Sequence, residues 1–167
     1  LTSLWVKTAY SQYSKIPNRQ GITGAEAARI ILRQAGIRDV RVEVTRGWLS
    51  DHYSPTDKVL RLSPRNYAEA SIAAVGIAAH EAGHAIQHAQ RFAPLVLRNI
   101  AVPAASIGSN MGYLVLTIGL VMAYGGANPL NPLTLLGLLC LALVALFQLV
   151  NLPVEFDASR RALGVLP

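Results

Sequence analysis

The residues best suited to chemistry lie in one short segment, His80-Glu81-Ala82-Gly83-His84. In an α-helix, residues four apart lie one turn apart on the same face, so both imidazoles can point at one metal ion. Glu81 lies beside them, where its carboxylate reaches the water that such a metal activates. This pattern is typical of zinc peptidases, in which the histidines are ligands and the glutamate is the general base. The segment therefore predicts a Zn²⁺ cofactor and hydrolysis of peptide bonds.

Two histidines leave a catalytic zinc one protein ligand short, because such a site uses three protein ligands and keeps one position for water. The metzincin pattern requires a Gly and a His where this chain has Gln87 and Gln90, so that class is excluded. A further residue of the same helix, His88, lies too far along the helix axis to close a tetrahedron. Asp51 and His52, from a predicted strand, remain alternatives for the third ligand.

The preferred third ligand is Glu155, which follows Pro153 at the end of a long apolar run. If the two apolar runs of the chain form a hairpin, they return this carboxylate to the side where His80 and His84 lie. The segment after Pro153 has its acidic residues first and its basic residues last, which suits a helix macrodipole. The alternative is that Glu155 and Asp157 only cap this short helix.

The elements that position the motif form a small domain at the N-terminal side. Thr23-Gly24-Ala25-Glu26 is an N-cap pattern, and it predicts a helix over about Gly24 to Ala35. Alternation over 40–44, and two runs at 48–53 and 58–62 around a turn, predict three short antiparallel strands. The Ala-rich segment 67–91, which contains the motif, is predicted to be one long helix.

The predicted strand 58–62 directly precedes the motif helix, and we expect it to be an exposed edge. Val59, Leu60 and Arg61 would then bind an extended peptide substrate through main-chain hydrogen bonds. On the neighbouring strand, His52 or Tyr53 could stabilise the oxyanion, and simple packing is the alternative for both.

Charge is distributed unevenly between the two parts of the chain. The net charge is +6, yet residues 100–154 contain no Asp, Glu, Lys or Arg. Two apolar runs in this part, 100–124 and 133–152, are each long enough for a bilayer core of about 30 Å, which needs about 20 apolar residues in a helix. They predict a transmembrane hairpin, and a lipid bilayer as a partner.

The basic residues beside these runs predict the orientation of the hairpin. Arg91 and Arg98 precede the first run, Arg160 and Arg161 follow the second, and the connecting loop has none, so both outer flanks are expected in the cytoplasm. Basic residues form no run and no stacking motif is visible, so nucleic acid is not expected as a partner. The single Cys140 excludes a disulfide framework within the chain.

These features together predict an α+β fold: a zincin-like domain with a small antiparallel sheet and an active-site helix, and a two-helix transmembrane hairpin. The expected parts are a cytoplasm-facing catalytic part (1–98), the hairpin (99–154) and a short helix that returns the third ligand (155–167). The expected location is the plasma membrane, as a multi-pass protein. The start at Leu1 rather than Met predicts a fragment of a longer protein. The sequence does not predict an oligomeric state.

Several segments together resemble the YugP-type neutral zinc metallopeptidases of bacterial membranes. The resemblance is carried by the motif 80–84, Glu155-Phe156-Asp157-Ala158-Ser159, Ser50-Asp51-His52-Tyr53-Ser54-Pro55, Leu60-Arg61-Leu62-Ser63-Pro64 and the helix start at Thr23. It implies a bacterial, membrane-embedded zinc peptidase with His80, His84 and a downstream Glu as ligands and Glu81 as base. More distantly, the arrangement is similar to the HtpX and CAAX prenyl protease group. That group has an Asp four residues after its ligand Glu, where this chain has Ser159, and the nearby acid here is Asp157.

Three other functions can be compared with this one. FtsH-type proteases share the motif but need an ATPase module with a phosphate-binding Gly-Lys loop, which this chain lacks. An intramembrane site-2-type protease would explain the membrane spans and the Asn-Pro pairs at 128–129 and 131–132, but its Leu-Asp-Gly sequence is absent. A non-catalytic zinc-binding membrane adaptor has no use for Glu81 beside the water position.

Overall fold

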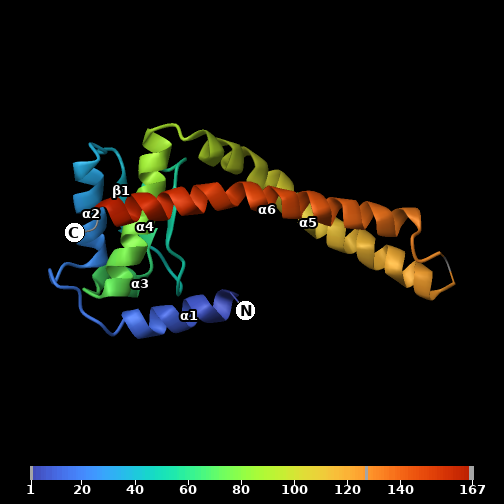
Figure 1. Ribbon diagram of the computed structural model, residues 1–167, viewed down its shortest axis with the longest axis horizontal. Coiled ribbons are helices and arrows are strands. Elements are labelled where there is room, and N and C mark those ends of the chain that lie inside the picture. The colour runs from blue at the N-terminus through green and yellow to red at the C-terminus, as the bar shows by residue number, and fades with distance from the viewer. Residues whose placement is uncertain (1, 127, 166–167) are drawn as a thin grey trace. The chain divides into compact units, whose positions relative to one another are not determined.

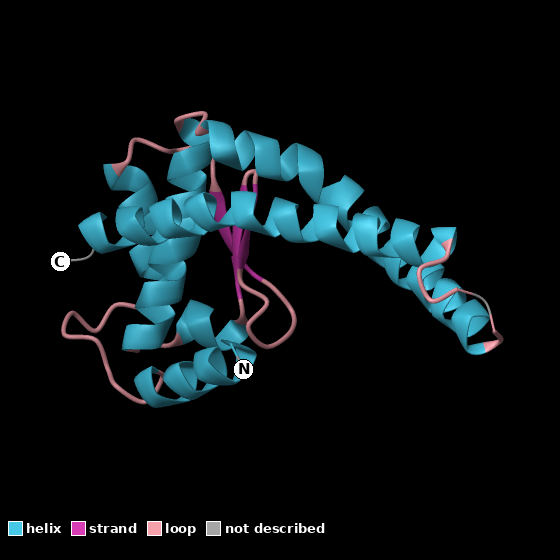
Figure 2. Ribbon diagram, turned by 45° about the vertical axis from the view of Figure 1, so that its right-hand side comes forward, coloured by secondary structure: helices cyan, strands magenta, loops and turns pink. Residues whose placement is uncertain are grey.

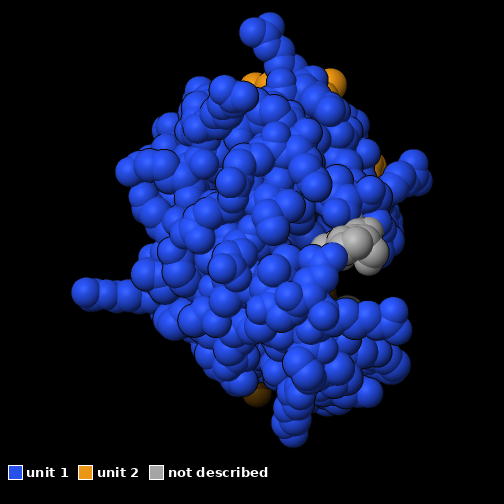
Figure 3. Space-filling view, turned by 90° about the vertical axis from the view of Figure 1, so that its left-hand side faces the viewer, with its two compact units in different colours: residues 1–92, 156–167 blue, residues 93–155 orange. Residues whose placement is uncertain are grey.

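The computed structural model describes residues 2–126 and 128–165 and divides the chain into two compact units. Unit 1 comprises Leu1–Phe92 and Phe156–Pro167, and unit 2 comprises Ala93–Glu155. Figure 3 gives the two units different colours. Helices and a small sheet are both present, so the mixed α+β class is confirmed.

Unit 1 begins with two helices, α1 (Thr2–Tyr13) and α2 (Gly24–Gln34). The predicted start of α2 is confirmed, because the Thr23 hydroxyl accepts a hydrogen bond from the Glu26 N–H and the Glu26 carboxylate accepts one from the Thr23 N–H. This reciprocal cap satisfies two backbone donors that the helix itself leaves unpaired. The buried face of α2 packs against α4 (Ile72–Ala89), and the two helices lie side by side in Figure 1.

The three strands form a mixed sheet, not the antiparallel sheet that was predicted (Figure 2). The order is β1 (Arg41–Val44), β3 (Val59–Leu62), β2 (His52–Ser54), with β3 parallel to β1 and antiparallel to β2. Each short connection reverses the chain direction, so the first and third strands run the same way. The strand alternation predicts these reversals, but it does not show that β3 inserts between the other two.

The prediction that β3 is an exposed, substrate-binding edge is therefore wrong. Both sides of β3 are paired, and Val59 and Leu60 are fully buried. Arg61 forms ion pairs with Glu43 and Asp57 instead of facing an open groove. An apolar strand that buries both faces is suited to the centre of a sheet, and the outer edge beside it belongs to β2.

The segment predicted as one helix over 67–91 consists of two helices, α3 (Pro64–Ala68) and α4. Between them Glu69 has an extended backbone (φ −86°, ψ 143°), and the Ser71 hydroxyl accepts a hydrogen bond from the Ala74 N–H at 3.2 Å. Ser71 is thus the N-cap of α4, and a capping serine stabilises a helix start by about 1 kcal/mol. Because the whole segment is rich in Ala, its composition does not indicate that a second helix starts after Ser71.

The last helix, α6 (Pro132–Val165), runs without interruption through Pro153, so no separate short helix begins after this proline. Proline removes one backbone hydrogen bond and usually kinks a helix. The residues around it in α6 are mostly apolar, and breaking the helix there would leave further backbone groups unpaired in apolar surroundings. The last part of α6, from Phe156 onward, belongs to unit 1.

Unit 2 consists of α5 (Ala93–Tyr124) and the first part of α6. Glycines bring these helices close together: a Cβ on Gly119 would lie 2.5 Å from the Thr134 backbone nitrogen, and one on Gly137 would lie 2.6 Å from that of Leu116. Small residues at such contacts are typical of helices that pack in membranes. The Asn131 side-chain oxygen Oδ1 caps α6 by accepting hydrogen bonds from the N–H groups of residues 133 and 134.

Two helical segments are long and apolar enough to cross a membrane: 105–124, in unit 2, and the helix α6, most of which lies in unit 2. Only 11% and 12% of their apolar windows are buried, unlike the core helices of a soluble protein. Large apolar side chains such as Val121, Leu139 and Leu146 are more than half exposed. An apolar surface of this extent indicates association with a membrane.

Candidate metal centre

The motif lies in the second half of α4, and its two histidines share one face of the helix. The His80 and His84 rings are 4.8 Å apart between centroids and nearly perpendicular, at 83°. His84 is buried and His80 is half-buried. The predicted one-turn spacing therefore brings both imidazoles together on one face of α4.

Gly83, between the two histidines, allows another helix to cross α4 at very short distance. A Cβ on Gly83 would lie 2.6 Å from the carbonyl oxygen of Ala158, in the part of α6 that belongs to unit 1. Any side chain at this position would push the two backbones apart. The third position of the motif thus has a packing function that the sequence pattern alone does not specify.

Glu155 directly precedes this part of α6 on the same helix. One ligand atom each from His80, His84 and Glu155 lie within 4.8 Å of one another. A tetrahedral zinc ion with bonds of about 2.0–2.2 Å holds its donors about 3.3–3.5 Å apart, so a small movement of these side chains closes the site. Two imidazoles and one carboxylate are also a donor set that catalytic zinc uses, so these residues fit the ion. The Arg98 guanidinium lies 3.3 Å from Oε1 of Glu155 and forms an ion pair with this carboxylate.

Each histidine ring has a hydrogen-bond partner at Nδ1. The Ser159 hydroxyl lies 3.2 Å from Nδ1 of His80, and the Gln87 side-chain oxygen lies 2.9 Å from Nδ1 of His84. Such partners orient a metal-binding histidine and raise its basicity. With Nδ1 engaged in each ring, Nε2 is the atom suited to bind the metal.

Glu81 does not belong to the three-residue cluster and lies in a largely enclosed environment. Burial raises the pKa of Glu81, while the neighbouring imidazoles of His84 and His80 oppose that effect. Its carboxylate also accepts a hydrogen bond from the Tyr53 backbone N–H on the edge strand β2. A carboxylate whose pKa is raised by burial is suited to accept a proton and release it again.

The alternative third ligands lie elsewhere in hydrogen-bonded positions. Asp51 accepts bonds from the Ser63 N–H at 2.7 Å and from the Asn66 amide at 2.9 Å, so it fastens the start of β2 to α3. The Nδ1 atom of His52 lies 2.8 Å from the Ser50 carbonyl oxygen, and His88 is hydrogen bonded through Nδ1 to the Tyr53 hydroxyl at 2.8 Å. Among the residues that the structure describes, none of these three histidine or aspartate side chains joins the metal cluster.

Tyr53 and Asp157, predicted as accessory residues, have defined partners. The Tyr53 hydroxyl is committed to His88, and burial raises the pKa of Tyr53 to about 12. Asp157 accepts hydrogen bonds from the Arg161 guanidinium and from the Gln87 amide at 2.8 Å. Burial tends to raise the pKa of Asp157, but these bonds together outweigh it and lower the pKa. Asp157 thus contacts a residue that in turn contacts His84.

Sequence reasoning missed three residues of the site: Gly83, Gln87 and Ser159. Gln87 was used only to exclude the metzincin pattern, although it lies three residues after His84 and therefore on the same face of the helix. Ser159 lies four residues after Glu155 and therefore one helical turn away, and this spacing was a signal for a partner of the metal site. For Gly83 the sequence held no signal beyond the glycine itself.

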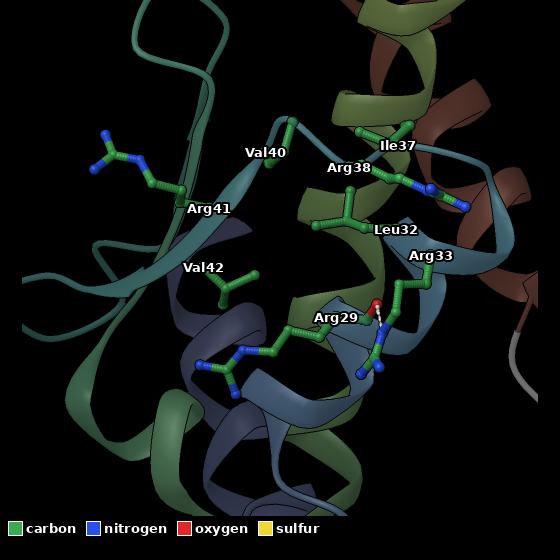
Figure 4. Close-up of a pocket in the computed structure, with 8 residues that line it drawn as sticks. All are labelled: Arg29, Leu32, Arg33, Ile37, Arg38, Val40, Arg41 and Val42. Atoms are coloured by element: carbon green, nitrogen blue, oxygen red, sulfur yellow. Dashed lines mark hydrogen bonds between the residues drawn. The ribbon is translucent and has the colours of Figure 1, made fainter.

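A pocket of about 600 Å³ lies between α2 and β1 in unit 1 (Figure 4). Its lining is apolar at Leu32, Ile37, Val40 and Val42, with four arginines around it: Arg29, Arg33, Arg38 and Arg41. Figure 4 shows the guanidinium groups of Arg38 and Arg41 pointing in opposite directions, away from the pocket. The basic groups do not converge on one point, so the pocket has no built site for an anion. It shares no residue with the metal cluster.

Comparison with known proteins agrees with the chemistry of this cluster. Residues 1–167 match the family described as "Putative neutral zinc metallopeptidase". The chain is 42% identical over 161 residues to the "Putative membrane protease YugP" of Bacillus subtilis (strain 168). The aligned region covers 96% of this chain and 69% of that protein. No solved structure matches the chain significantly. The chain therefore belongs to this family of neutral zinc metallopeptidases, whose cofactor is Zn²⁺.

Proposed function

We propose that the chain is a membrane-anchored zinc endopeptidase in which His80, His84 and Glu155 hold the zinc and Glu81 is the general base. The observation that carries the proposal is the cluster itself: two imidazoles and one carboxylate within 4.8 Å of one another, with a second, half-buried carboxylate on the adjacent helical position. Three protein ligands and a nearby base are what a catalytic zinc site requires.

Zinc, when bound, supplies a Lewis acid that polarises the scissile carbonyl and acidifies water. Glu81 accepts the proton from the attacking water and delivers it to the nitrogen of the leaving amine. The Tyr53 N–H holds the Glu81 carboxylate in place through these transfers. Proton transfer by a positioned carboxylate of this kind contributes about 10²–10⁴-fold to a rate.

The outer edge of β2 is the place we propose for the substrate backbone. Tyr53 lies opposite Leu60 in the antiparallel pair, and its N–H points toward Glu81 instead of toward β3. In such a pair the N–H and C=O of one residue point to the same side. The Tyr53 carbonyl therefore faces the same outer edge, where it could accept a hydrogen bond from the N–H of an extended peptide that lies next to Glu81.

Unit 2 supplies the proposed membrane anchor, a hairpin of α5 and α6 that spans the bilayer. Arg91 and Arg98 near its start and Arg160 and Arg161 near its end favour a cytoplasmic location for both flanks. The loop 125–131 between the helices contains no charged residue and is proposed to face outward. The catalytic part would then act in the cytoplasm on a peptide or on a membrane protein.

Two alternatives have less support. An intramembrane site-2-type protease would place the motif within an apolar span, whereas α4 packs against α2, α3 and the sheet of unit 1. The Asn131-Pro132 pair has a capping function at the start of α6. A non-catalytic zinc-binding adaptor leaves the half-buried Glu81 beside the cluster without a function.

The proposal is tested with the full chain purified in detergent and a casein substrate. Glu81→Gln should retain one zinc per chain, since it alters no proposed ligand, and should lose cleavage by about 10²–10⁴-fold. Glu69→Gln, which changes an exposed pair with Arg65, is the matched control and should cleave as wild type does. Full activity of Glu81→Gln, or loss of its zinc in a folded protein, would contradict the proposed role of Glu81.

A further inference from the structure

Gln87 is a polar side chain that is fully buried one turn after His84. Its side-chain oxygen lies 2.9 Å from Nδ1 of His84, and its side-chain nitrogen donates to Oδ2 of Asp157 at 2.8 Å. A buried amide is costly unless both of its ends are hydrogen bonded. The contacts of Gln87 therefore connect a proposed zinc ligand with a carboxylate on α6.

Asp157 determines which end of the Gln87 amide faces His84. An ionised carboxylate only accepts hydrogen bonds, and Asp157 is paired with the Arg161 guanidinium, which donates to the same oxygen, Oδ2. The Gln87 –NH₂ group must therefore face Asp157, and the Gln87 carbonyl oxygen must face His84. Arg161 is itself held by a second bond, from Nη1 to the Gln90 side-chain oxygen.

The orientation of the amide in turn determines the tautomer of His84. An amide oxygen has no proton to donate, so the His84–Gln87 bond forms only when Nδ1 of His84 carries the proton. In a neutral imidazole with a proton on Nδ1, the lone pair suited to bind a metal is on Nε2. His80 differs, because the Ser159 hydroxyl can either donate or accept and so does not select a tautomer.

We infer that Gln87, Asp157 and Arg161 are positioning residues that fix His84 in its Nδ1–H tautomer before any metal binds. The inference rests on the proposed function only in taking His84 as a zinc ligand. All residues of this chain of contacts lie in unit 1, on α4 and on the last part of α6. Partners of this kind typically change metal affinity by about 10–100-fold.

The test is a ¹⁵N-histidine NMR spectrum of the zinc-free full chain in detergent micelles, at a pH about two units above the ordinary histidine pKa of about 6.5. Wild-type His84 should show a protonated Nδ1. Asp157→Ala should weaken this preference, because it removes the carboxylate that accepts from the Gln87 –NH₂ group. Asp157→Asn should restore it, since a side-chain oxygen can again accept from both Gln87 and Arg161. Gln87→Met, which removes the acceptor itself, should behave like Asp157→Ala.

Zinc affinity, measured by competition with a chelator, provides the second readout. Asp157→Ala and Gln87→Met should bind zinc about 10–100-fold more weakly, and Asp157→Asn should bind within a few fold of wild type. Asp57→Asn, at an exposed turn, is the control and should change neither readout.

The outcomes separate this inference from the proposed function. A proton on Nε2 of His84 in the zinc-free wild type, or an unchanged tautomer in a folded Asp157→Ala, would overturn the inference even if the enzyme is active. A wild-type chain that binds no zinc would overturn the proposed function, and the NMR result would still decide the tautomer.

Discussion

Gly83→Ala tests whether the close crossing of α4 and α6 sets the geometry of the metal site. The added Cβ would lie 2.6 Å from the Ala158 carbonyl oxygen, whereas ordinary contacts begin at 3.4 Å. One backbone must therefore move by roughly 0.8 Å, and overpacking of this kind costs about 1–3 kcal/mol. Alanine also favours a helix over glycine by about 0.8–1 kcal/mol, so the net loss of stability is expected to be at most about 2 kcal/mol.

The effect on zinc should exceed the effect on folding. Metal–ligand distances are held to within about ±0.2 Å, and a displacement of roughly 0.8 Å is several times larger. Glu155 is carried by the same helix as Ala158, so we expect zinc affinity to fall by at least about tenfold. Chelator competition gives the affinity, and thermal unfolding of the zinc-free protein gives the stability.

Gly76→Ala is the matched control, because Gly76 lies in the same helix and a Cβ there meets nothing within 4 Å. Only the helix preference remains, so the midpoint of thermal unfolding should rise by about 2–4 °C with unchanged zinc affinity. If Gly83→Ala gave the same increase and the same affinity as Gly76→Ala, the close crossing would have no bearing on the metal site.

Two further predictions concern the membrane hairpin and the Tyr53 hydroxyl. The orientation is tested in a Cys140→Ala background with a maleimide that does not cross membranes. Tyr124→Cys should react with it in intact cells, whereas Thr56→Cys should react only after lysis. The reverse pattern would contradict the proposed orientation. Burial raises the pKa of Tyr53 to about 12 in the folded chain, whereas an exposed tyrosine in the unfolded chain has a pKa of about 10. The unfolded chain therefore loses the Tyr53 proton at lower pH, and the free energy of unfolding should fall as pH rises from about 10 to 12. Tyr53→Phe should remove this part of the pH dependence in unfolding experiments, and an unchanged dependence would mean that Tyr53 does not cause it.

Local patterns predicted the site better than they predicted the connections between elements. The spacing of His80 and His84, and the cap at Thr23, depend only on neighbouring residues, and the structure has both as expected. The insertion of β3 between its neighbours depends on tertiary packing, which the alternation of apolar and polar residues in a strand does not determine. Pro153 suggested a helix end, but α6 continues through it. A break among these mostly apolar residues would leave further backbone groups unpaired.

Residues that act through a partner were the hardest to identify from the sequence. Gln87 has no motif of its own, and its importance appears only when Asp157, seventy positions later, lies against it. The same holds for Ser159 and His80. A sequence pattern can therefore predict the residues of the metal cluster, but the side chains that contact them appear only from the packing of α4 against the last part of α6.

The most direct test of the account is the zinc dissociation constant of Glu155→Gln, compared with wild type and with Glu81→Gln in the same detergent. Loss of a ligand carboxylate should weaken binding by at least about 10–100-fold, while Glu81→Gln should bind as wild type does. Far-ultraviolet circular dichroism confirms that each variant is folded. If Glu155→Gln bound zinc as tightly as wild type, Glu155 would not be the third ligand, and the proposed metal centre would be wrong.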